Sequence, residues 1–300
     1  MRVRAHYSLL NEIESGPNAT LPALEPLIAR WHGTRIRRID RYIQLCVAGG
    51  LNCIAGQPLH PQTGVYLASR VGAVSTSAKT MIQTEQKAEM PKPLHFVNTL
   101  GNSAGFYLTQ LLGLTGTAVV VSQEWLSFES ALLHAWLDLQ QGRIDCALVG
   151  GFDEVPLPTS HQLERLDQAH ISPPPTHLTE GTHWLLLERS TDPFGTNLGA
   201  PLWLADAQEL EQWLQTQERF DRIQTSFNPN SAETALLTTH ADEQQVFTRT
   251  AALHGTFSGA ALVHLSEQLE GRSIGYRALH LMRGPGGPYG AVVLSRHVIA

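Results

Sequence analysis

The feature that most constrains the fold is a strand, helix and strand pattern between residues 117 and 151. Residues 117–121 and 146–151 are short apolar runs, which are typical of buried strands. Between them, an apolar helical face is formed by side chains three or four positions apart: Trp125, Phe128, Leu132, Trp136 and Leu139. Ser122 precedes this helix, where its hydroxyl can cap the first turn. This order predicts a layered α/β fold.

The same alternation continues along the chain. Further strands are predicted at residues 65–69, 183–188, 222–226 and 290–295, and further helices at residues 101–114, 207–216 and 257–269. Three consecutive prolines at 173–175 predict a loop between two strands. Turn-forming residues are concentrated at 190–199, so we expect two unequal α/β halves, residues 1–195 and 196–300.

The composition excludes several classes of protein. The 300 residues are 42% hydrophobic and 16% charged, which favours a folded chain with a large core over disorder. The formal charge of -6 with 21 Lys and Arg residues gives no basic excess, so we expect no nucleic-acid partner. The N-terminus lacks the apolar segment of a secretory signal, and no apolar run is long enough to span a membrane.

Cysteine and histidine usage predicts neither a disulfide framework nor a metal site. Cys46 and Cys53 lie on one face of a predicted helix, and Cys146 begins a predicted strand, so we expect buried, reduced thiols in a cytoplasmic protein. The 14 histidines include no pair with metal-binding helical spacing. We therefore expect no metal and no cofactor.

Basic side chains are concentrated in one part of the chain: Arg30, Arg35, Arg37, Arg38 and Arg41. Such a cluster is typical of a solvated helix start, and it also suits docking of an acidic partner protein. Both interpretations remain open at this stage.

Several motifs follow one another in an order that resembles a known family. The strongest is Gly-Arg-Ile-Asp-Cys-Ala-Leu-Val-Gly-Gly-Phe-Asp at residues 142–153. Weaker matches lie at residues 35–41, 98–105, 114–116, 180–189, 254–261 and 289–295. Together they are similar to the thiolase-fold β-ketoacyl synthases. The resemblance implies an αβαβα layered fold built from two α/β halves.

The resemblance also implies positions for the catalytic cysteine and two histidines of that family. Counting back from the Gly-x-x-Asp motif places the cysteine position at Trp125, and an indole cannot hold an acyl chain as a thioester. The second position falls on Ser226 or Phe227. The third falls on Gly255, or on His254 if the alignment slips by one residue. With this set incomplete, we expect no catalytic residue.

Within the family, the chain resembles the catalytically inactive chain-length-factor subunits of type II polyketide systems. Residues 127–133 are similar to the aryl polyene type. Such a subunit forms a heterodimer with an active ketosynthase and bounds the cavity in which a polyketide, polyene or fatty-acid-like chain grows on an acyl carrier protein. We therefore expect Trp125 to fill the base of this cavity and residues 117–121 to contact the partner. A homodimer is the alternative.

Two groups of residues follow from this expectation. Arg35, Arg37, Arg38 and Arg41 become candidates for docking the acyl carrier protein. Candidates for the pocket or the partner interface are Gln123, Asn102, Phe128, Val119 and Val121.

One enzymatic alternative is an active ketosynthase-like acyltransferase, and specifically a malonyl decarboxylase. Some loading ketosynthases replace the cysteine by glutamine and retain decarboxylation. Gln123 resembles that glutamine, but it stands two residues before the expected position. A capping or interface role for Gln123 is the simpler interpretation.

The other enzymatic alternative is a serine hydrolase. Residues 101–105 match the Gly-x-Ser-x-Gly nucleophile elbow, in which Ser103 attacks an ester. Asp206 and His240 or His254 are then the candidate acid and base. Small residues that let a helix pack closely explain the same motif.

Overall fold

The elements of the chain come from the computed structural model, which describes residues 1–14, 20–33, 36–155, 177–189, 195–247, 257–284 and 286–296. The elements up to residue 188 are β1 (Arg2–Glu14), α1 (Glu25–Ala29), α2 (Arg41–Ile54), β2 (Gly64–Ala68), α3 (Val74–Met81), η1 (Ile82–Gln86), α4 (Pro93–Asn98), α5 (Asn102–Leu112), β3 (Ala118–Val121), η2 (Glu124–Leu126), α6 (Ser127–Gln140), β4 (Cys146–Asp153) and β5 (His177–Glu188). The remainder are β6 (Thr196–Leu198), β7 (Leu202–Leu204), α8 (Ala207–Gln215), β8 (Phe220–Thr225), α9 (Ser231–His240), β9 (Ala241–Val246), α10 (Phe257–Glu270), β10 (Arg277–Arg283) and β11 (Tyr289–Arg296).

The described strands form one mixed sheet, in which the same strand order occurs twice. The order is β3-β2-β4-β5-β1-β6-β11-β10-β8-β9, with β7 also paired to β11. In the first part β5 is antiparallel to β4 and β1, and in the second β11 is antiparallel to β10 and β6. With β7 left out, and with the strands of each half numbered in chain order and read from the outer edge (β3 or β9), both read 3-2-4-5-1. The division between residues 195 and 196 remains a prediction, which this repeat supports.

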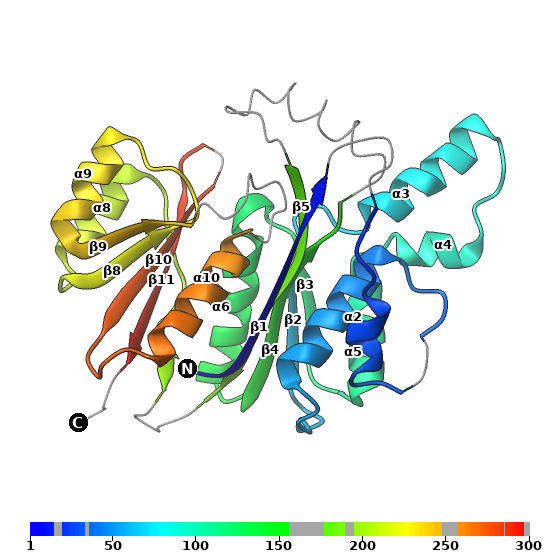
Figure 1. Ribbon diagram of the computed structural model, residues 1–300, viewed down its shortest axis with the longest axis horizontal. Helices are drawn as coiled ribbons and strands as arrows, with labels where there is room; N and C mark the ends of the chain where they lie inside the picture. The colour runs from blue at the N-terminus through cyan, green and yellow to red at the C-terminus, as the bar shows by residue number, and fades with distance from the viewer. Residues whose placement is uncertain are drawn as a thin grey trace.

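Helices form three layers around the two parts of the sheet (Figure 1). Helix α2 contacts β1, β4 and β5, and α5 contacts β2 and β3, so these helices cover the outer face of the first part. Helices α6 and α10 contact strands of both parts and lie between them. Helices α8 and α9 cover the second part from outside. The predicted αβαβα layering is confirmed.

The first core lies under α2 and contains the fully buried Trp184 of β5. The Trp184 ring stacks on Phe152 with 6.2 Å between ring centroids, and its Nε1 donates to Thr182 Oγ1 at 2.6 Å. Two glycines make this possible, because a Cβ on Gly49 would lie 2.0 Å from Trp184 Nε1 and one on Gly150 would lie 2.4 Å from its ring. The close approach of α2 and β4 to Trp184 thus depends on the absence of side chains.

The structure confirms the predicted elements and corrects several details. Strand β3 is an edge strand with exposed and half-exposed side chains, so the prediction of a buried strand at 117–121 was wrong. The α-helix predicted from Trp125 begins at Ser127, after the 3₁₀ turn η2. Ser122 does not cap it, because its hydroxyl donates to the carbonyl of Arg70 at 3.3 Å. Within the described part of the chain, no helix is long and apolar enough to cross a membrane.

Candidate functional site

The predicted cysteine position lies in the turn that leads from β3 into α6. The backbone of Glu124 has a φ of 47°, a left-handed conformation that strains a residue with a side chain. The Ser127 hydroxyl accepts from the N–H of Gln123 at 2.9 Å and donates to the carbonyl of Glu124 at 2.7 Å. These bonds hold the turn in one sharp conformation, and the next residue is Trp125.

Trp125 is half-buried, and its indole has two kinds of neighbour. It packs against a small apolar cluster formed by Ile13, Val155 and Leu178. The guanidinium carbon of Arg70 lies 4.0 Å from the centroid of its ring, in cation–π geometry. An indole held in this way fills space and offers no nucleophile at the cysteine position.

The second predicted position follows β8 and is occupied by packed aromatic and polar side chains. The N–H of Ser226 donates to the carbonyl of Leu281 in β10 at 3.0 Å. The Phe227 ring lies 6.0 Å from Tyr289 and 4.7 Å from the Arg283 guanidinium carbon. Arg283 in turn pairs with Glu233 at 2.8 Å. No imidazole occupies the Ser226–Phe227 position.

The structure brings the first two predicted positions to the same region. The turn η2 contacts β10 and α10, and β10 is hydrogen-bonded to the residue that follows β8. Leu126 fits against two glycines, Gly284 just after β10 and Gly290 in β11: a Cβ on Gly284 would lie 3.3 Å from Leu126 Cδ1, and one on Gly290 would lie 3.0 Å from Cδ2. The third position, His254 or Gly255, lies outside the described residues.

A buried polar cluster lies directly behind this turn. Nε2 of His280 in β10 is 3.0 Å from Oε1 of Glu129 in α6, and Ser258 of α10 donates to Oε2 of Glu129 at 3.1 Å. All three residues are fully buried. This cluster was not predicted from the sequence. The signal for it was Glu129, an acidic residue next to Phe128 in an otherwise apolar part of the helix.

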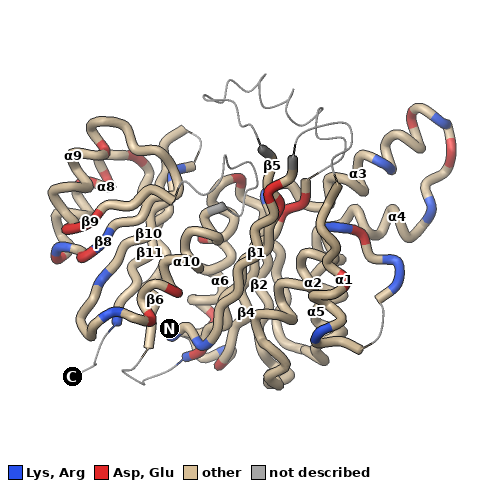
Figure 2. The backbone as a smooth tube through the Cα atoms, in the orientation of Figure 1, with Lys and Arg blue, Asp and Glu red and all other residues tan. Residues whose placement is uncertain are grey.

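Buried carboxyl groups gather at the carboxyl end of β4, and Figure 2 shows acidic residues near the adjoining end of β5. Burial raises the pKa of Asp153 to about 6. Hydrogen bonds from Ser69 and from the backbone of Arg70 lower this pKa, but burial has the larger effect. Burial also raises the pKa of Glu154 to about 7, and the negative charges of Asp40 and Glu180 add to the effect. No group of three His, Cys, Asp or Glu side chains suited to a metal occurs among the described residues.

The pocket and interface candidates have different environments. Val119 and Val121 are half-exposed on the edge strand β3, and Asn102 is exposed at the start of α5. Gln123 is exposed, and its side-chain carbonyl accepts from the Ser130 hydroxyl of α6. It precedes η2, but its side chain makes no hydrogen bond that caps the helix backbone. Phe128 is fully buried against α10, where a Cβ on Gly259 would lie 2.7 Å from its ring. Phe128 is therefore a core residue, and its prediction as a pocket or interface residue was wrong.

The hydrolase interpretation of Ser103 was also wrong. A nucleophile elbow joins a strand to a helix, whereas Ser103 lies in the first turn of α5 and is preceded by another helix, α4. Its hydroxyl donates to the carbonyl of Val97 at 2.6 Å. The proposed acid, Asp206, instead caps α8 by accepting from the N–H of Gln208 at 2.9 Å.

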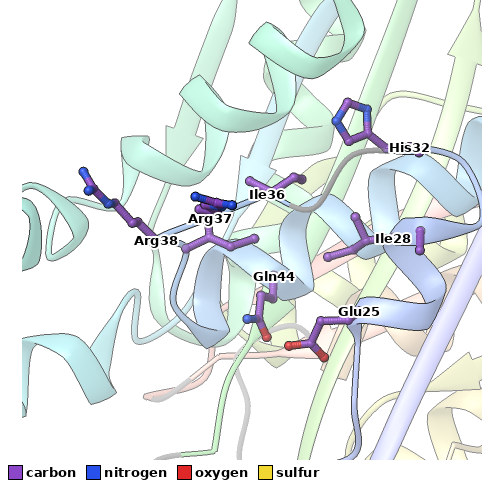
Figure 3. Close-up of a pocket in the computed structure, with 10 residues that line it drawn as sticks. Glu25, Ile28, His32, Ile36, Arg37, Arg38 and Gln44 are labelled. Carbon is purple, nitrogen blue, oxygen red and sulfur yellow. The ribbon is translucent and has the colours of Figure 1, made fainter.

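The basic cluster is divided by the fold. Arg37 and Arg38 are exposed and line a cavity of about 720 Å³ between α1 and the start of α2, with apolar walls that include Ile28. Figure 3 shows the two arginines on one side of this cavity and Ile28 on the other. Arg41 is different, since its side chain is 13% exposed and its guanidinium makes two hydrogen bonds to the carboxylate of the buried Glu180. The docking prediction is therefore wrong for Arg41, and Arg35 lies outside the described residues.

Comparison with known proteins agrees with this architecture. The family model for the N-terminal domain of beta-ketoacyl synthase matches residues 13–176, more than half of the chain. Because this match covers more than half of the chain, the chain belongs to the β-ketoacyl synthase family. No curated protein sequence gives a match.

Solved structures show the same fold. The ishigamide ketosynthase/chain length factor is 18% identical with a TM-score of 0.74, and the match covers 90% of this chain and 85% of that one. A second match is a chain of the structure described as a type II PKS acyl-carrier protein in complex with its ketosynthase bound to the hexaketide. It is 14% identical with a TM-score of 0.73, and the match covers 90% of this chain and 88% of that one. A beta-ketoacyl synthase from Burkholderia phymatum STM815 is 14% identical with a TM-score of 0.67, covering 90% and 86%. The fold is therefore the thiolase-like fold of ketosynthases.

Proposed function

We propose that this chain is a non-catalytic ketosynthase-like subunit, which forms a heterodimer with an active ketosynthase and shapes its acyl-chain cavity. One observation carries the proposal: Trp125, at the position that the family resemblance assigns to the acylated cysteine, is packed against Ile13 and stacked on Arg70. A ketosynthase needs a thiolate there to hold the growing chain. The similarity to a ketosynthase/chain length factor supports the same role.

A chain that does not hold an acyl group contributes through its partner, and the surface supports such a partner. Among the described strands, β3 is the last at one edge of the sheet and pairs on one side only, with Val119 and Val121 half-exposed. Free strand edges are ready templates for pairing with another chain. We propose that β3 pairs with a strand of the active ketosynthase, which extends the sheet across the heterodimer.

Exposed apolar side chains continue this surface onto the neighbouring helices. They belong to α3, η1, α4, the connection to α5 and α5 itself: Met81, Ile82, Phe96, Val97, Leu100 and Phe106. Phe106 is 61% exposed and Phe96 is 59% exposed. Several large apolar side chains in one region are typical of a protein interface rather than of a monomer surface. Their position supports a broad, permanent contact.

The proposal extends to an acyl carrier protein and to the product. Arg37 and Arg38 are exposed beside the cavity next to α1, which suits contact with an acidic carrier protein. One solved structure with this fold is a ketosynthase complex with an acyl-carrier protein. We propose a polyketide or polyene product of the aryl polyene type, from residues 127–133, and a cytoplasmic location, which agrees with the free cysteines Cys46, Cys53 and Cys146.

Co-expression with an active ketosynthase tests the heterodimer. The tagged chain is expressed with a ketosynthase that has the Cys-His-His set, and the purified complex is weighed by light scattering. We expect a one-to-one complex. Phe106→Glu, on the proposed interface, should abolish it, while the matched control Ile274→Glu should not, because Ile274 is 58% exposed in the connection between α10 and β10, away from β3. A stable homodimer that ignores the ketosynthase would support the alternative assembly instead.

A further inference from the structure

The backbone of Arg70 is fixed at the carboxyl end of β2. Its N–H donates to both carboxylate oxygens of Asp153, at 3.1 and 3.2 Å, and the next N–H, that of Val71, donates to Oδ1 at 3.2 Å. The carbonyl of Arg70 accepts from the Ser122 hydroxyl at 3.3 Å. Asp153 is fully buried at the end of β4, the strand that pairs with β2. The backbone of Arg70 is therefore hydrogen-bonded both to the end of β4 and to Ser122 in the turn before η2.

The side chain of Arg70 reaches from this fixed point across the turn that carries Trp125. Its guanidinium carbon lies 4.0 Å from the indole centroid, and its Nε lies 3.4 Å from Oε2 of Glu124, the residue with the left-handed backbone. One cation therefore contacts two successive side chains of a strained turn. Cation–π contact with tryptophan is the strongest of its kind, and a planar guanidinium can stack on the ring, which an ammonium cannot.

The other described neighbours of Trp125 do not fix the orientation of its ring. They are Ile13, Val155 and Leu178, which form a small apolar cluster, and the indole is half-exposed. Apolar contact is not directional, so the cluster by itself leaves rotation of the indole open. Among the contacts of Trp125 with the described residues, the directional one is the cation–π contact with the Arg70 guanidinium.

We propose that Arg70 is a positioning residue that holds the Trp125 indole in one orientation and thereby determines where the acyl-chain cavity ends. The inference rests on the proposed function, because it assigns the residue that sets the length limit of the subunit. Arg70 acts through Trp125 and has no contact with the acyl chain. Loss of Arg70 therefore releases the indole without removing it.

The orientation of Trp125 is measured by ¹⁹F NMR on the full chain labelled with 5-fluorotryptophan. The sequence contains six tryptophans, and the Trp125 resonance is assigned as the one lost in Trp125→Phe. Arg70→Gln and Arg70→Lys should shift or broaden this resonance. Arg30→Gln is the matched control, since the Arg30 guanidinium carbon lies 5.5 Å from the Trp31 centroid, and it should move only the Trp31 resonance. An unchanged Trp125 resonance in both Arg70 variants would overturn the proposal.

The effect on length is measured with the ketosynthase heterodimer. Arg70→Gln should give longer or more heterogeneous products, in the same direction as Trp125→Leu, and should have no further effect when combined with Trp125→Leu. A product change by Arg70→Gln that persists without Trp125 contradicts positioning through the indole. If no heterodimer forms at all, the proposed function fails, while the NMR experiment on the chain alone still decides whether Arg70 orients Trp125.

Discussion

Nε2 of His280 lies 3.0 Å from Oε1 of Glu129, and both side chains are fully buried between the two parts of the sheet. Helix α6 supplies Glu129 and strand β10 supplies His280, so the hydrogen bond joins the two halves behind the turn that carries Trp125. Truncating one member of a buried pair leaves the other unpaired in a low-dielectric interior. We expect Glu129→Ala to lower the free energy of unfolding by about 3 kcal/mol, measured by urea denaturation.

A double-mutant cycle separates the pair from general packing. Replacing both residues, as in Glu129→Leu with His280→Leu, removes the unpaired group and should cost less than the sum of the single changes. The control is Asp145→Asn, which breaks an ion pair with Arg189 between side chains that are 83% and 53% exposed. That change should cost less than about 1 kcal/mol. Additive single changes at Glu129 and His280 would show that the two residues are not coupled.

Stability should depend on pH through Glu154. Burial and nearby negative charges raise the pKa of this carboxyl group from the ordinary 4.5 to about 7, so the folded chain binds the proton more tightly than the unfolded chain. Its contribution to stability is complete below about pH 4.5 and is lost as the pH rises through about 7. Glu154→Gln removes the ionisable group, and at pH 8 it should be more stable than the wild type by on the order of 2–3 kcal/mol.

The measurement is the free energy of unfolding of wild type and Glu154→Gln from pH 4 to pH 8, and the quantity of interest is their difference. Glu233 provides a contrast of opposite sign. Burial raises its pKa, but hydrogen bonds from Tyr289 and Asn230 and the charge of Arg283 outweigh burial and lower it. Glu233→Gln should therefore lose stability at neutral pH and converge with the wild type in acid. If the difference in unfolding free energy between Glu154→Gln and the wild type stays constant from pH 4 to pH 8, the raised pKa of Glu154 is refuted.

A third prediction concerns the packing of Trp184. The Cβ of an alanine at position 49 would lie 2.0 Å from Trp184 Nε1 and 2.1 Å from Thr182 Oγ1, so helix α2 must move away from β5. We expect Gly49→Ala to destabilise the chain by about 3 kcal/mol, since overpacking of a fixed core is costly. Gly271→Ala is the control, because nothing lies within 4 Å of its Cβ position, and it should change stability by less than about 0.5 kcal/mol.

The sequence was sufficient to predict the architecture because the patterns that specify it are local. The apolar run of β4 and the helical period of α6 depend on neighbouring residues only, and both elements were predicted. The 13-residue strand β1 was not predicted, although Val3, Ala5, Tyr7 and Leu9 alternate with polar residues, a period typical of a half-buried strand. Its place in the sheet is determined by pairing with β5, a contact between residues up to 186 positions apart, as in Arg2 with Glu188. The alternation indicates a strand, but it does not say which strand pairs with it.

The candidate site was predictable in position but not in chemistry. Counting from a motif placed Trp125 at the start of the helix, whereas the structure has it in the 3₁₀ turn η2, two residues before α6 begins. Nothing in the sequence near Arg70 links it to Trp125, since the two meet only because β2 and β3 are adjacent strands. The exposure of β3 within the chain was not predicted from its residues, because a run of valines is equally consistent with a central strand and an edge strand. Only the family resemblance led us to expect these residues at a partner interface.

A fourth prediction is that the chain carries no acyl group. The structure describes two of the three positions that the resemblance assigns to the catalytic cysteine and histidines. They hold Trp125 and Ser226 or Phe227, and none of these side chains forms a thioester. The protein is incubated with malonyl- and acyl-loaded carrier protein, and its intact mass and the release of CO₂ are measured. We expect neither an adduct nor decarboxylation. A stoichiometric adduct would refute the non-catalytic assignment, and CO₂ release that Gln123→Ala abolishes would support the decarboxylase alternative.

The last prediction concerns the size of the side chain at position 125. Truncating a fully buried indole costs about 3–5 kcal/mol, but Trp125 is half-buried, so Trp125→Leu should cost less and leave the chain folded. Trp125→Phe keeps an aromatic face for the Arg70 guanidinium and should preserve the heterodimer. If the indole closes the end of the cavity, product length should increase from wild type to Trp125→Phe and again to Trp125→Leu, as measured by mass spectrometry of the released chains. An unchanged product distribution from well-folded heterodimers of both variants would remove Trp125 from the length-setting role and leave it as structural packing.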